Sequence, residues 1–336
     1  MRRISLTLGL IATLGVSLVG ATVATSAATK SGQRAGTTID LVAYSTPKAA
    51  YGQLISAFQA TPAGKDVSFT QSYGASGDQA RAVLAGQPAD VVALSLASDI
   101  FPLISGGLVD NKWNKNKFNG MVTDSVVSFL VRKGNPKHIK GLGDLARKGV
   151  EVLTPNPFTS GGARWNVMAA YGAKRRQGAS DAQAIGYLSQ LFHHVTVQDT
   201  SARNALTTFS QGKGDVLIDY ESEGIFADKQ GVPSDYVLPR QTILIENPIA
   251  LTKSGRSKPA AAAFLAFLRT PQAQTIWAKN GYRPVVQSVF KKSGFPVPAG
   301  QFTIRDLGLG GWAKVQKRFF DSRTGVMAKI EKEIGG

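Results

Sequence analysis

The sequence predicts an α/β fold with largely parallel sheets. Short runs rich in β-branched residues alternate along the chain with segments whose apolar residues recur at helical spacing. No internal repeat or low-complexity tract interrupts this alternation. The shares of hydrophobic and charged residues, 43% and 18% of 336 positions, are typical of a soluble globular protein.

The strands and helices follow from these patterns in chain order. The expected strands are residues 39–43, 67–71, 90–94, 126–131, 150–154, 195–198, 215–219 and 243–251. Tyr51, Leu54, Ile55 and Phe58 place one apolar stripe on a helix, and the same spacing recurs over 165–172 and 202–209. Four C-terminal helices are expected at residues 259–268, 271–280, 311–320 and 326–334.

The first residues have the plan of a secretory signal peptide. Arg2 and Arg3 precede an apolar run over 4–20, and small residues then fill 21–27. We therefore expect residues 1–27 to be a signal peptide and the protein to act in the periplasm or cell envelope. The run is short for a membrane anchor, which is the competing interpretation. The chain has no cysteine, so thiol catalysis, cysteine metal sites and a cysteine lipid anchor are excluded.

The formal net charge of +17 favours an anionic partner. The basic residues are scattered, and no nucleic-acid motif accompanies them, so nucleic acid is not the expected partner. Three roles for the basic residues remain open: solvated surface, steering of small anions and adhesion to a negatively charged envelope.

Two expected strands are candidates for crossings between domains, because each leads into a turn rich in glycine, asparagine or serine. We expect one lobe at 37–125 plus 252–336 and a second at 133–243. The hinges between them are expected at about 126–132 and 244–251.

One pattern occurs at three strand ends: a segment containing serine precedes a helix that begins with small residues. It is found over 72–81, 156–165 and 199–204. A weaker case is Thr46, which we expect to cap a helix beginning at Pro47.

The first turn of a helix leaves amide N–H groups without partners, and the helix dipole makes that end partly positive. Glycine lets an anion approach the backbone, and serine adds a hydroxyl donor. A small tetrahedral anion therefore suits such ends, which meet at the carboxyl edge of an α/β sheet. Ordinary helix capping is the alternative for any one segment.

Several of these segments resemble the sulfate-binding proteins of ABC importers. The segments are residues 72–81, 89–94, 129–136, 154–157, 159–165, 214–218 and 281–284, and the similarity runs from about residue 38 to Gln316. This resemblance implies the two-lobed fold of type II periplasmic binding proteins, with two crossing hinge strands. It also implies a monomer that closes over sulfate and delivers it to the membrane subunits of a permease, without a cofactor or metal.

The resemblance also implies the residues that contact the anion. Ser76 is expected to donate from its hydroxyl and its amide. Ser160, Gly161 and Gly162 are expected to donate at the second helix start, and Ala202 at the third.

Two matched positions depart from the family pattern. Ser45 stands where the family often has aspartate, but that contact is a backbone amide. Tyr220 stands where an indole donor usually sits; a phenol can also donate, with different reach. Packing between the lobes is the alternative role for Tyr220.

Three arginines, Arg81, Arg164 and Arg203, each follow one of the serine segments. A guanidinium can bind an anion directly through charge-assisted hydrogen bonds. We expect instead that they hold the binding loops from behind.

Sulfate carries no proton at neutral pH, so a site made only of donors suits it, whereas hydrogen phosphate needs an acceptor. Thiosulfate, molybdate and phosphate remain alternative ligands. Substituting Gly161 by aspartate is expected to abolish binding, because it places a carboxylate beside the anion.

An anion-processing enzyme is the rival class. The sequence contains three histidines but no metal-ligand spacing, no G-x-S-x-G elbow and no phosphate-binding loop. Glu221 and Glu223 form a weak candidate acid/base pair and are expected instead on a polar lobe rim. We expect no catalytic residue.

Overall fold

The computed structural model describes residues 36–335, and the expected signal peptide at 1–27 lies outside them. The strands are β1 Thr37–Tyr44, β2 Val67–Gly74, β3 Val91–Ala93, β4 Met121–Arg132, β5 Val152–Pro155, β6 Val195–Asp199, β7 Val216–Tyr220, β8 Ser234–Val237, β9 Leu244–Leu251 and β10 Arg283–Pro284. The longer helices are α1 Lys48–Gln59, α2 Ser76–Leu84, α4 Gly161–Arg176, α5 Asp181–Phe192, α6 Ala202–Ser210, α7 Glu221–Lys229, α9 Pro259–Phe267, α10 Pro271–Lys279, α12 Gly311–Phe320 and α13 Val326–Gly335. The short ones are η1 Ala97–Asp99, α3 Phe101–Ser105, η2 Leu142–Asp144, α8 Lys253–Arg256, α11 Gln287–Ser293 and η3 Arg305–Leu307.

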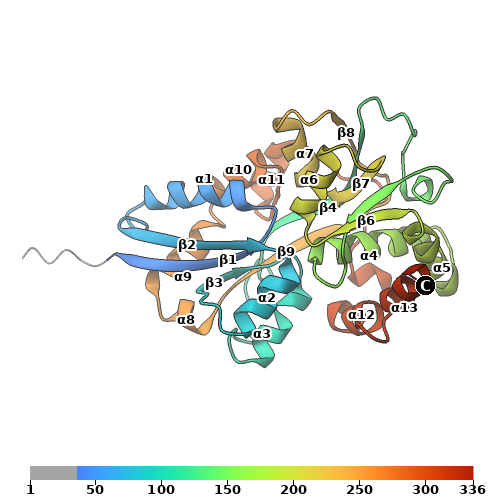
Figure 1. The fold of residues 1–336 in the computed structure, drawn as a ribbon. Helices are drawn as coiled ribbons and strands as arrows, with labels where there is room; N and C mark the ends of the chain where they lie inside the picture. The colour runs from blue at the N-terminus through green and yellow to red at the C-terminus, as the bar shows by residue number, and fades with distance from the viewer. Residues whose placement is uncertain (1–35, 336) are drawn as a thin grey trace, which may run out of the picture. The chain divides into compact units, whose positions relative to one another are not determined.

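The strands form two parallel groups joined by two antiparallel strands (Figure 1). Strands β2, β1 and β3 are parallel to one another, as are β7, β5 and β6. Between the groups, β9 pairs with β3 and β4 pairs with β7, and β4 and β9 also pair with each other. The predicted α/β class is therefore confirmed, but the sheet is mixed rather than largely parallel. Among the strands that the structure describes, four pairs are parallel and five are antiparallel, and each antiparallel pair includes β4 or β9, the strands expected as crossings.

Burial explains why the parallel strands were readable from sequence. All residues of β5 and β7 are buried, as are those of β3. Strands covered on both faces by helices read as continuous apolar runs rather than alternating ones. The expected helices at 51–58, 165–172 and 202–209 are present as α1, α4 and α6.

Some helices were not predicted. Helix α5 begins at a capping box in which the Ser180 hydroxyl accepts from the Gln183 amide, and the Gln183 side chain accepts from the Ser180 amide. The Ser-x-x-Gln spacing was a usable signal for this helix start. Helix α7 follows directly from the strand that ends at Tyr220.

The expectation that Thr46 caps the first helix is wrong. Helix α1 begins at Lys48 behind Pro47, without a side-chain cap. The Thr46 hydroxyl is instead buried and accepts a hydrogen bond from Tyr282 Oη at 3.0 Å. A tertiary contact with a residue far along the chain has replaced the local cap.

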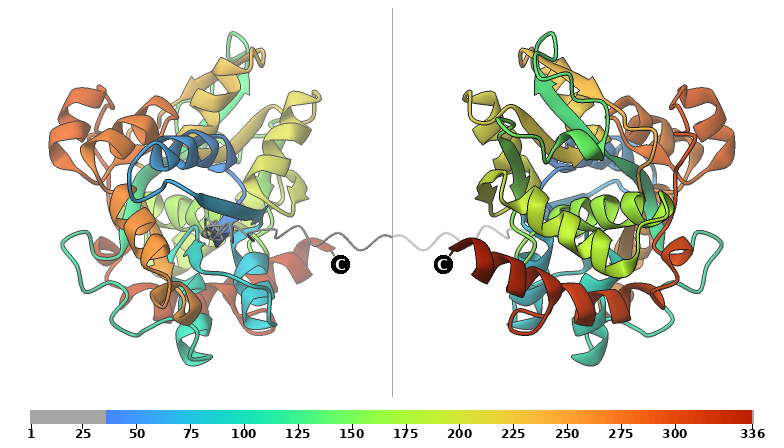
Figure 2. Two further views of the ribbon diagram at one scale, coloured as in Figure 1. Left: turned by 90° about the vertical axis from the view of Figure 1, so that its left-hand side faces the viewer. Right: turned by 90° about the vertical axis from the view of Figure 1, so that its right-hand side faces the viewer.

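Helices α12 and α13 lie along α4 and α5 (Figure 2). Trp312 of α12 packs edge-on against Trp165 of α4, with ring centroids 4.6 Å apart. Arg318 of the same helix pairs with Asp181 of α5. Helix α12 also contacts η1, which follows β3. The C-terminal helices thus contact elements beside both strand groups, and the division of the chain into lobes at the stated boundaries stays a prediction.

Within residues 36–335 no helix is both long and apolar enough to span a membrane. The largest apolar core contains β1, β5 and β7 residues together with α1, α4 and α5.

Candidate functional site

The carboxyl ends of all six parallel strands open onto one small cavity of about 160 Å³ of empty space. Its walls come from segments that follow each of these strands, and nine of the ten lining residues are buried. The lining residues are Tyr44, Ser45, Ala75, Ser76, Ser95, Ser160, Gly161, Gly162, Ala202 and Tyr220. The cavity is therefore far too small for a drug-sized ligand.

All seven residues predicted to contact the anion lie in this wall: Ser45, Ser76, Ser160, Gly161, Gly162, Ala202 and Tyr220. The structure brings them together from five separate segments of chain, and their individual contacts to an anion remain predictions. Sequence reasoning missed Tyr44, Ala75 and Ser95, which also line the cavity. Ser95 follows the buried strand β3 but lacks the helix pattern after it.

At the helix starts around the cavity, some backbone amides donate hydrogen bonds to protein groups and others have no protein partner. At α4 and α6, the Ser160 and Ser201 hydroxyls accept from the third amide of each helix. The second amide of α2, from Gly77, donates to Thr159 O at 3.0 Å, and that of α6, from Arg203, donates to Ser45 Oγ at 3.4 Å.

Five amides of the cavity wall have no protein hydrogen-bond partner within residues 36–335. They are the first amides of three helices and the second amide of α4, from Ser76, Gly161, Gly162 and Ala202, together with the Ser45 amide. Buried amides without partners are rare in proteins, because leaving one unpaired costs about 1–3 kcal/mol. Their concentration in one cavity indicates a site that binds an acceptor.

Hydroxyl groups add further donors. Ser45 Oγ and Ser160 Oγ each accept from an amide, so their own hydrogens are available to the cavity. The Ser76 hydroxyl differs from the expectation. It donates to Asp99 Oδ2 at 2.6 Å and accepts from the Ser95 amide at 2.9 Å, so in this structure Ser76 faces the cavity through its amide alone.

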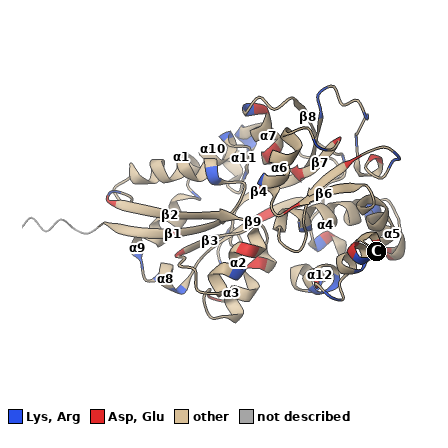
Figure 3. Cartoon of the chain, viewed as in Figure 1, with Lys and Arg blue, Asp and Glu red and all other residues tan. Residues whose placement is uncertain are grey.

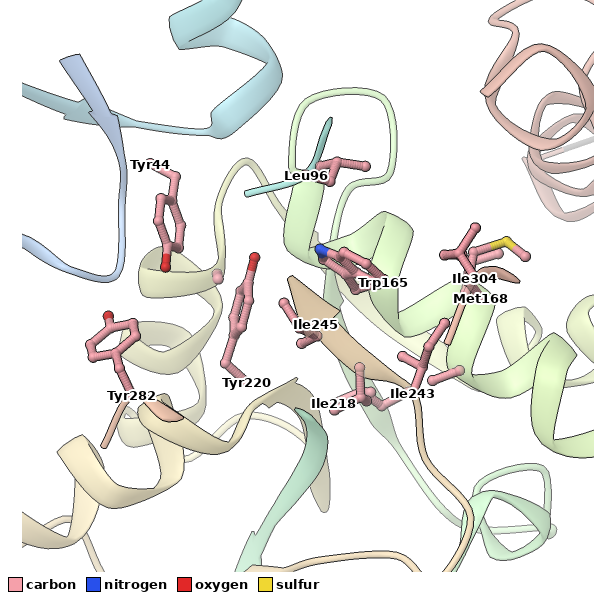
Figure 4. Packing of buried hydrophobic residues seen from close by; sticks show 14 of the residues in the cluster. Tyr44, Leu96, Trp165, Met168, Ile218, Tyr220, Ile243, Ile245, Tyr282 and Ile304 are labelled. Carbon is pink, nitrogen blue, oxygen red and sulfur yellow. The ribbon is translucent and has the colours of Figure 1, made fainter. Parts of the chain in front are cut away.

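Tyr220 lies at the junction of the two strand groups. Its ring packs beside Tyr44 with centroids 6.0 Å apart, and its Oη lies 2.5 Å from Ser95 Oγ. Figure 4 shows the two tyrosine rings next to each other, with the Trp165 indole nitrogen turned toward the segment that carries Leu96. Burial raises the pKa of Tyr220 well above 10.0, so its phenol stays protonated at neutral pH. Both roles considered for Tyr220, hydroxyl donor and packing between segments, are compatible with this position.

Two of the three arginines hold the loops behind the cavity. Arg164 donates to Asp99 Oδ1 at 2.6 Å and to Pro157 O at 2.9 Å. Arg203 donates to Thr46 O at 2.9 Å and to both oxygens of Glu223 at 2.7 Å. Arg81 points elsewhere: its side chain is 58% exposed and pairs with Asp78 on the same helix.

The expected polar rim at Glu221 and Glu223 is wrong, because both are fully buried in the first turn of α7. Each is neutralised by an arginine: Glu221 by Arg283 at 2.5 Å and Glu223 by Arg203 at 2.7 Å. Next to them, burial and the neighbouring Glu223 raise the pKa of Asp219 well above 3.8. The charges beneath the cavity are therefore paired or suppressed, and buried pairing of this kind is the condition for burying carboxylates at all.

Among the residues that the structure describes, no side chain with a formal charge lines the cavity. The wall therefore presents unpaired amides and hydroxyls to its centre and offers neither an ammonium nor a carboxylate. Neutral donors of this kind can replace the hydration shell of an anion.

The family model described as bacterial extracellular solute-binding protein matches residues 39–283. The chain belongs to this family.

Similar members of the family carry narrower names. The sulfate-binding protein of Synechococcus elongatus is 40% identical over 309 residues, covering 89% of this chain and 87% of the relative. The thiosulfate-binding protein of Pseudomonas aeruginosa is 36% identical, covering 76% and 80%. The solved structure of the sulfate-binding protein SubI from Mycobacterium tuberculosis is 44% identical, with a TM-score of 0.82 over 85% of this chain and all of the other.

These similarities confirm the resemblance to sulfate-binding proteins and the fold that it implied. Both strand groups supply free amides to the cavity: two come from Ser45 and Ser76, and three come from Gly161, Gly162 and Ala202.

Proposed function

We propose that this extracellular solute-binding protein captures sulfate and delivers it to the membrane subunits of an ABC importer. The observation that carries the proposal is the cavity wall, in which five amides without protein partners surround a space for a few atoms. The names of the similar relatives, sulfate-binding proteins and thiosulfate-binding proteins, support the same ligand class.

The chemistry of the wall supports a fully ionised guest. An amide N–H can only donate, so a ligand oxygen that carries a proton would find few acceptors in this wall. Sulfate has no proton at neutral pH and matches a site of donors. Hydrogen phosphate would leave its own O–H facing other donors, so we propose that the site discriminates against phosphate.

Hydrogen bonds rather than helix dipoles supply most of the affinity. A helix end contributes at most about 2 kcal/mol, whereas each hydrogen bond to a charged group contributes about 1.5–3 kcal/mol. The arginines lie behind the wall and stiffen it, with Arg164 joining the loop at Pro157 to Asp99 beyond the other strand group.

Binding without turnover forms part of the proposal. His193 Nδ1 hydrogen-bonds the Ser189 carbonyl, and His194 Nδ1 hydrogen-bonds the Val150 carbonyl. Neither histidine lines the cavity. The buried glutamates nearest the site are held in ion pairs with arginine. The wall thus lacks a base placed to activate a nucleophile.

Titration calorimetry of the purified protein with sulfate, thiosulfate, molybdate and phosphate tests the proposal. We expect heat of binding with sulfate and weaker or absent heat with phosphate. Thiosulfate binding as tight as sulfate binding would broaden the ligand class to both anions. Failure of all four anions to bind would refute the assignment.

A further inference from the structure

Two hydroxyl groups from different strand groups meet at the cavity wall. Ser95 follows β3, and Tyr220 is the last residue of β7. Their oxygens lie 2.5 Å apart, and each residue is only 1% exposed. Neither oxygen has another hydrogen-bond partner within residues 36–335.

The hydrogens of this pair can be counted. Two hydroxyls carry two hydrogens, and the bond between them uses one. Either oxygen could be the donor in that bond, so the second hydrogen belongs to whichever residue accepts. It has no protein acceptor and lies in the wall of the cavity. The pair therefore presents one O–H donor to the cavity, from either of two oxygens.

We propose that Ser95 and Tyr220 act together as one shared donor to the bound anion. The hydrogen reaches the anion from Tyr220 when Ser95 donates to Tyr220, and from Ser95 when Tyr220 donates to Ser95. This inference rests on the proposed function of the cavity. It makes Ser95 an anion-binding residue and gives Tyr220 a partner that can replace it.

Ser95 is held firmly enough for this role. Its amide donates to Ser76 Oγ at 2.9 Å. Its carbonyl oxygen accepts from Trp165 Nε1 at 2.9 Å and from Asn247 Nδ2 at 3.0 Å. Contacts to three other segments therefore fix the backbone of Ser95, so that its hydroxyl has little freedom beyond rotation about one bond.

A shared donor has a distinctive consequence for mutations. Tyr220→Phe leaves the Ser95 hydroxyl with its hydrogen free for the anion, and Ser95→Ala leaves the Tyr220 hydroxyl free in the same way. Only the double variant removes the donor. The phenylalanine ring keeps the packing against Tyr44, so the change is confined to the hydroxyl.

The experiment is a double-mutant cycle measured by titration calorimetry with sulfate. We expect each single variant to weaken binding by less than about fivefold. The double variant is expected to weaken it by about 10- to 100-fold, the range for one hydrogen bond to a charged group. The matched control is Tyr73→Phe with Ser68→Ala, whose hydroxyls bond to Gln71 and Thr38 at exposed positions.

Each outcome decides the matter. If one single variant loses as much affinity as the double variant, that residue alone is the donor and the inference is overturned. If both single variants weaken binding strongly and the double variant weakens it by the product of the two effects, the residues make two independent contacts and the inference is overturned. A double variant whose affinity stays within fivefold of the original protein would also overturn the inference. Thermal unfolding of each variant separates these losses from misfolding. An original protein that binds no sulfate would instead refute the proposed function.

Discussion

Replacing Gly161 by alanine adds one methyl group where the start of α4 packs against the segment after β3. A Cβ built there would lie 2.2 Å from Leu96 Cδ2, 2.5 Å from Ser95 Cβ and 2.6 Å from Ser95 Oγ. Carbon atoms in favourable contact are about 3.5–4.0 Å apart. The start of α4 and the segment after β3 must therefore separate by more than about 1 Å.

This displacement sets the expected loss of affinity. Gly161 and Gly162 supply two of the free amides in the wall. N–H···O bonds span about 2.7–3.2 Å, so a shift of this size takes both donors out of range of an anion held by the opposite side. Two lost hydrogen bonds to a charged group amount to about 3–6 kcal/mol, or about 10²- to 10⁴-fold in affinity.

Titration calorimetry with sulfate measures this loss, and Gly186→Ala is the matched control. Gly186 lies exposed within α5, and a Cβ there meets nothing within 4 Å. We expect this control to keep the original affinity and to gain up to about 1 kcal/mol of stability from the better helix propensity of alanine.

The comparison with Gly161→Asp separates two physical causes. The expectation from sequence was that aspartate abolishes binding through its charge, in which case alanine at the same position is tolerated. The structure predicts that the methyl group alone is sufficient. Original affinity in Gly161→Ala, together with loss in Gly161→Asp, would refute the steric reasoning.

Three further predictions concern stability and rate. Asp124 lies opposite Glu246 on the paired strands β4 and β9, and burial with that neighbour raises the pKa of Asp124 to about 8. Its folded pKa lies above the unfolded value, so its contribution to stability is present at low pH and is lost as pH rises toward 8. Asp124→Asn is thus expected to raise the free energy of unfolding at pH 7 by up to about 4 kcal/mol and to change little below pH 4, measured by urea denaturation; an equal effect at both pH values would contradict this. Asp99→Ala leaves the buried Arg164 guanidinium without its carboxylate partner and is expected to lower the free energy of unfolding by about 3–5 kcal/mol. Urea denaturation measures this loss as well. A loss below about 1 kcal/mol would show that the ion pair is not buried. Most lysine and arginine side chains of the described residues are exposed, whereas about two thirds of the acidic ones are buried or half-buried. Figure 3 marks where the basic and acidic residues lie along the fold. We therefore expect the association rate for sulfate, followed by stopped-flow tryptophan fluorescence, to fall as ionic strength rises from about 0.01 to 0.1 M, and a constant rate would exclude steering by this surface.

Local signals were sufficient for much of the site. Serine and glycine at helix starts were visible in the sequence, and the positions Ser160, Gly161 and Ala202 all proved to line the cavity. These helix starts could be predicted because a helix start is a local structure with a local residue preference. Ser95 carries no such preference, so nothing in its own segment marked it as part of the wall.

Other parts of the expectation failed for a related reason. Glu221 and Glu223 read as solvated residues, and only the approach of Arg283 and Arg203 allows their burial. Thr46 was predicted to cap a helix, but its hydroxyl accepts a hydrogen bond from Tyr282 instead. In each case the deciding partner lies on another segment of the chain.

The sequence by itself determined the α/β class, most strands, the family and the chemistry available at the helix starts, since these depend on residue type and spacing within one segment. Only the tertiary structure decided which amides stay unpaired. The Gly77 amide donates to the Thr159 carbonyl, and the Arg203 amide donates to the Ser45 hydroxyl. The Ser76 hydroxyl donates to Asp99. The physical reason is that a hydrogen-bonding group is free only when no neighbour in space claims it, and those neighbours come from distant parts of the chain.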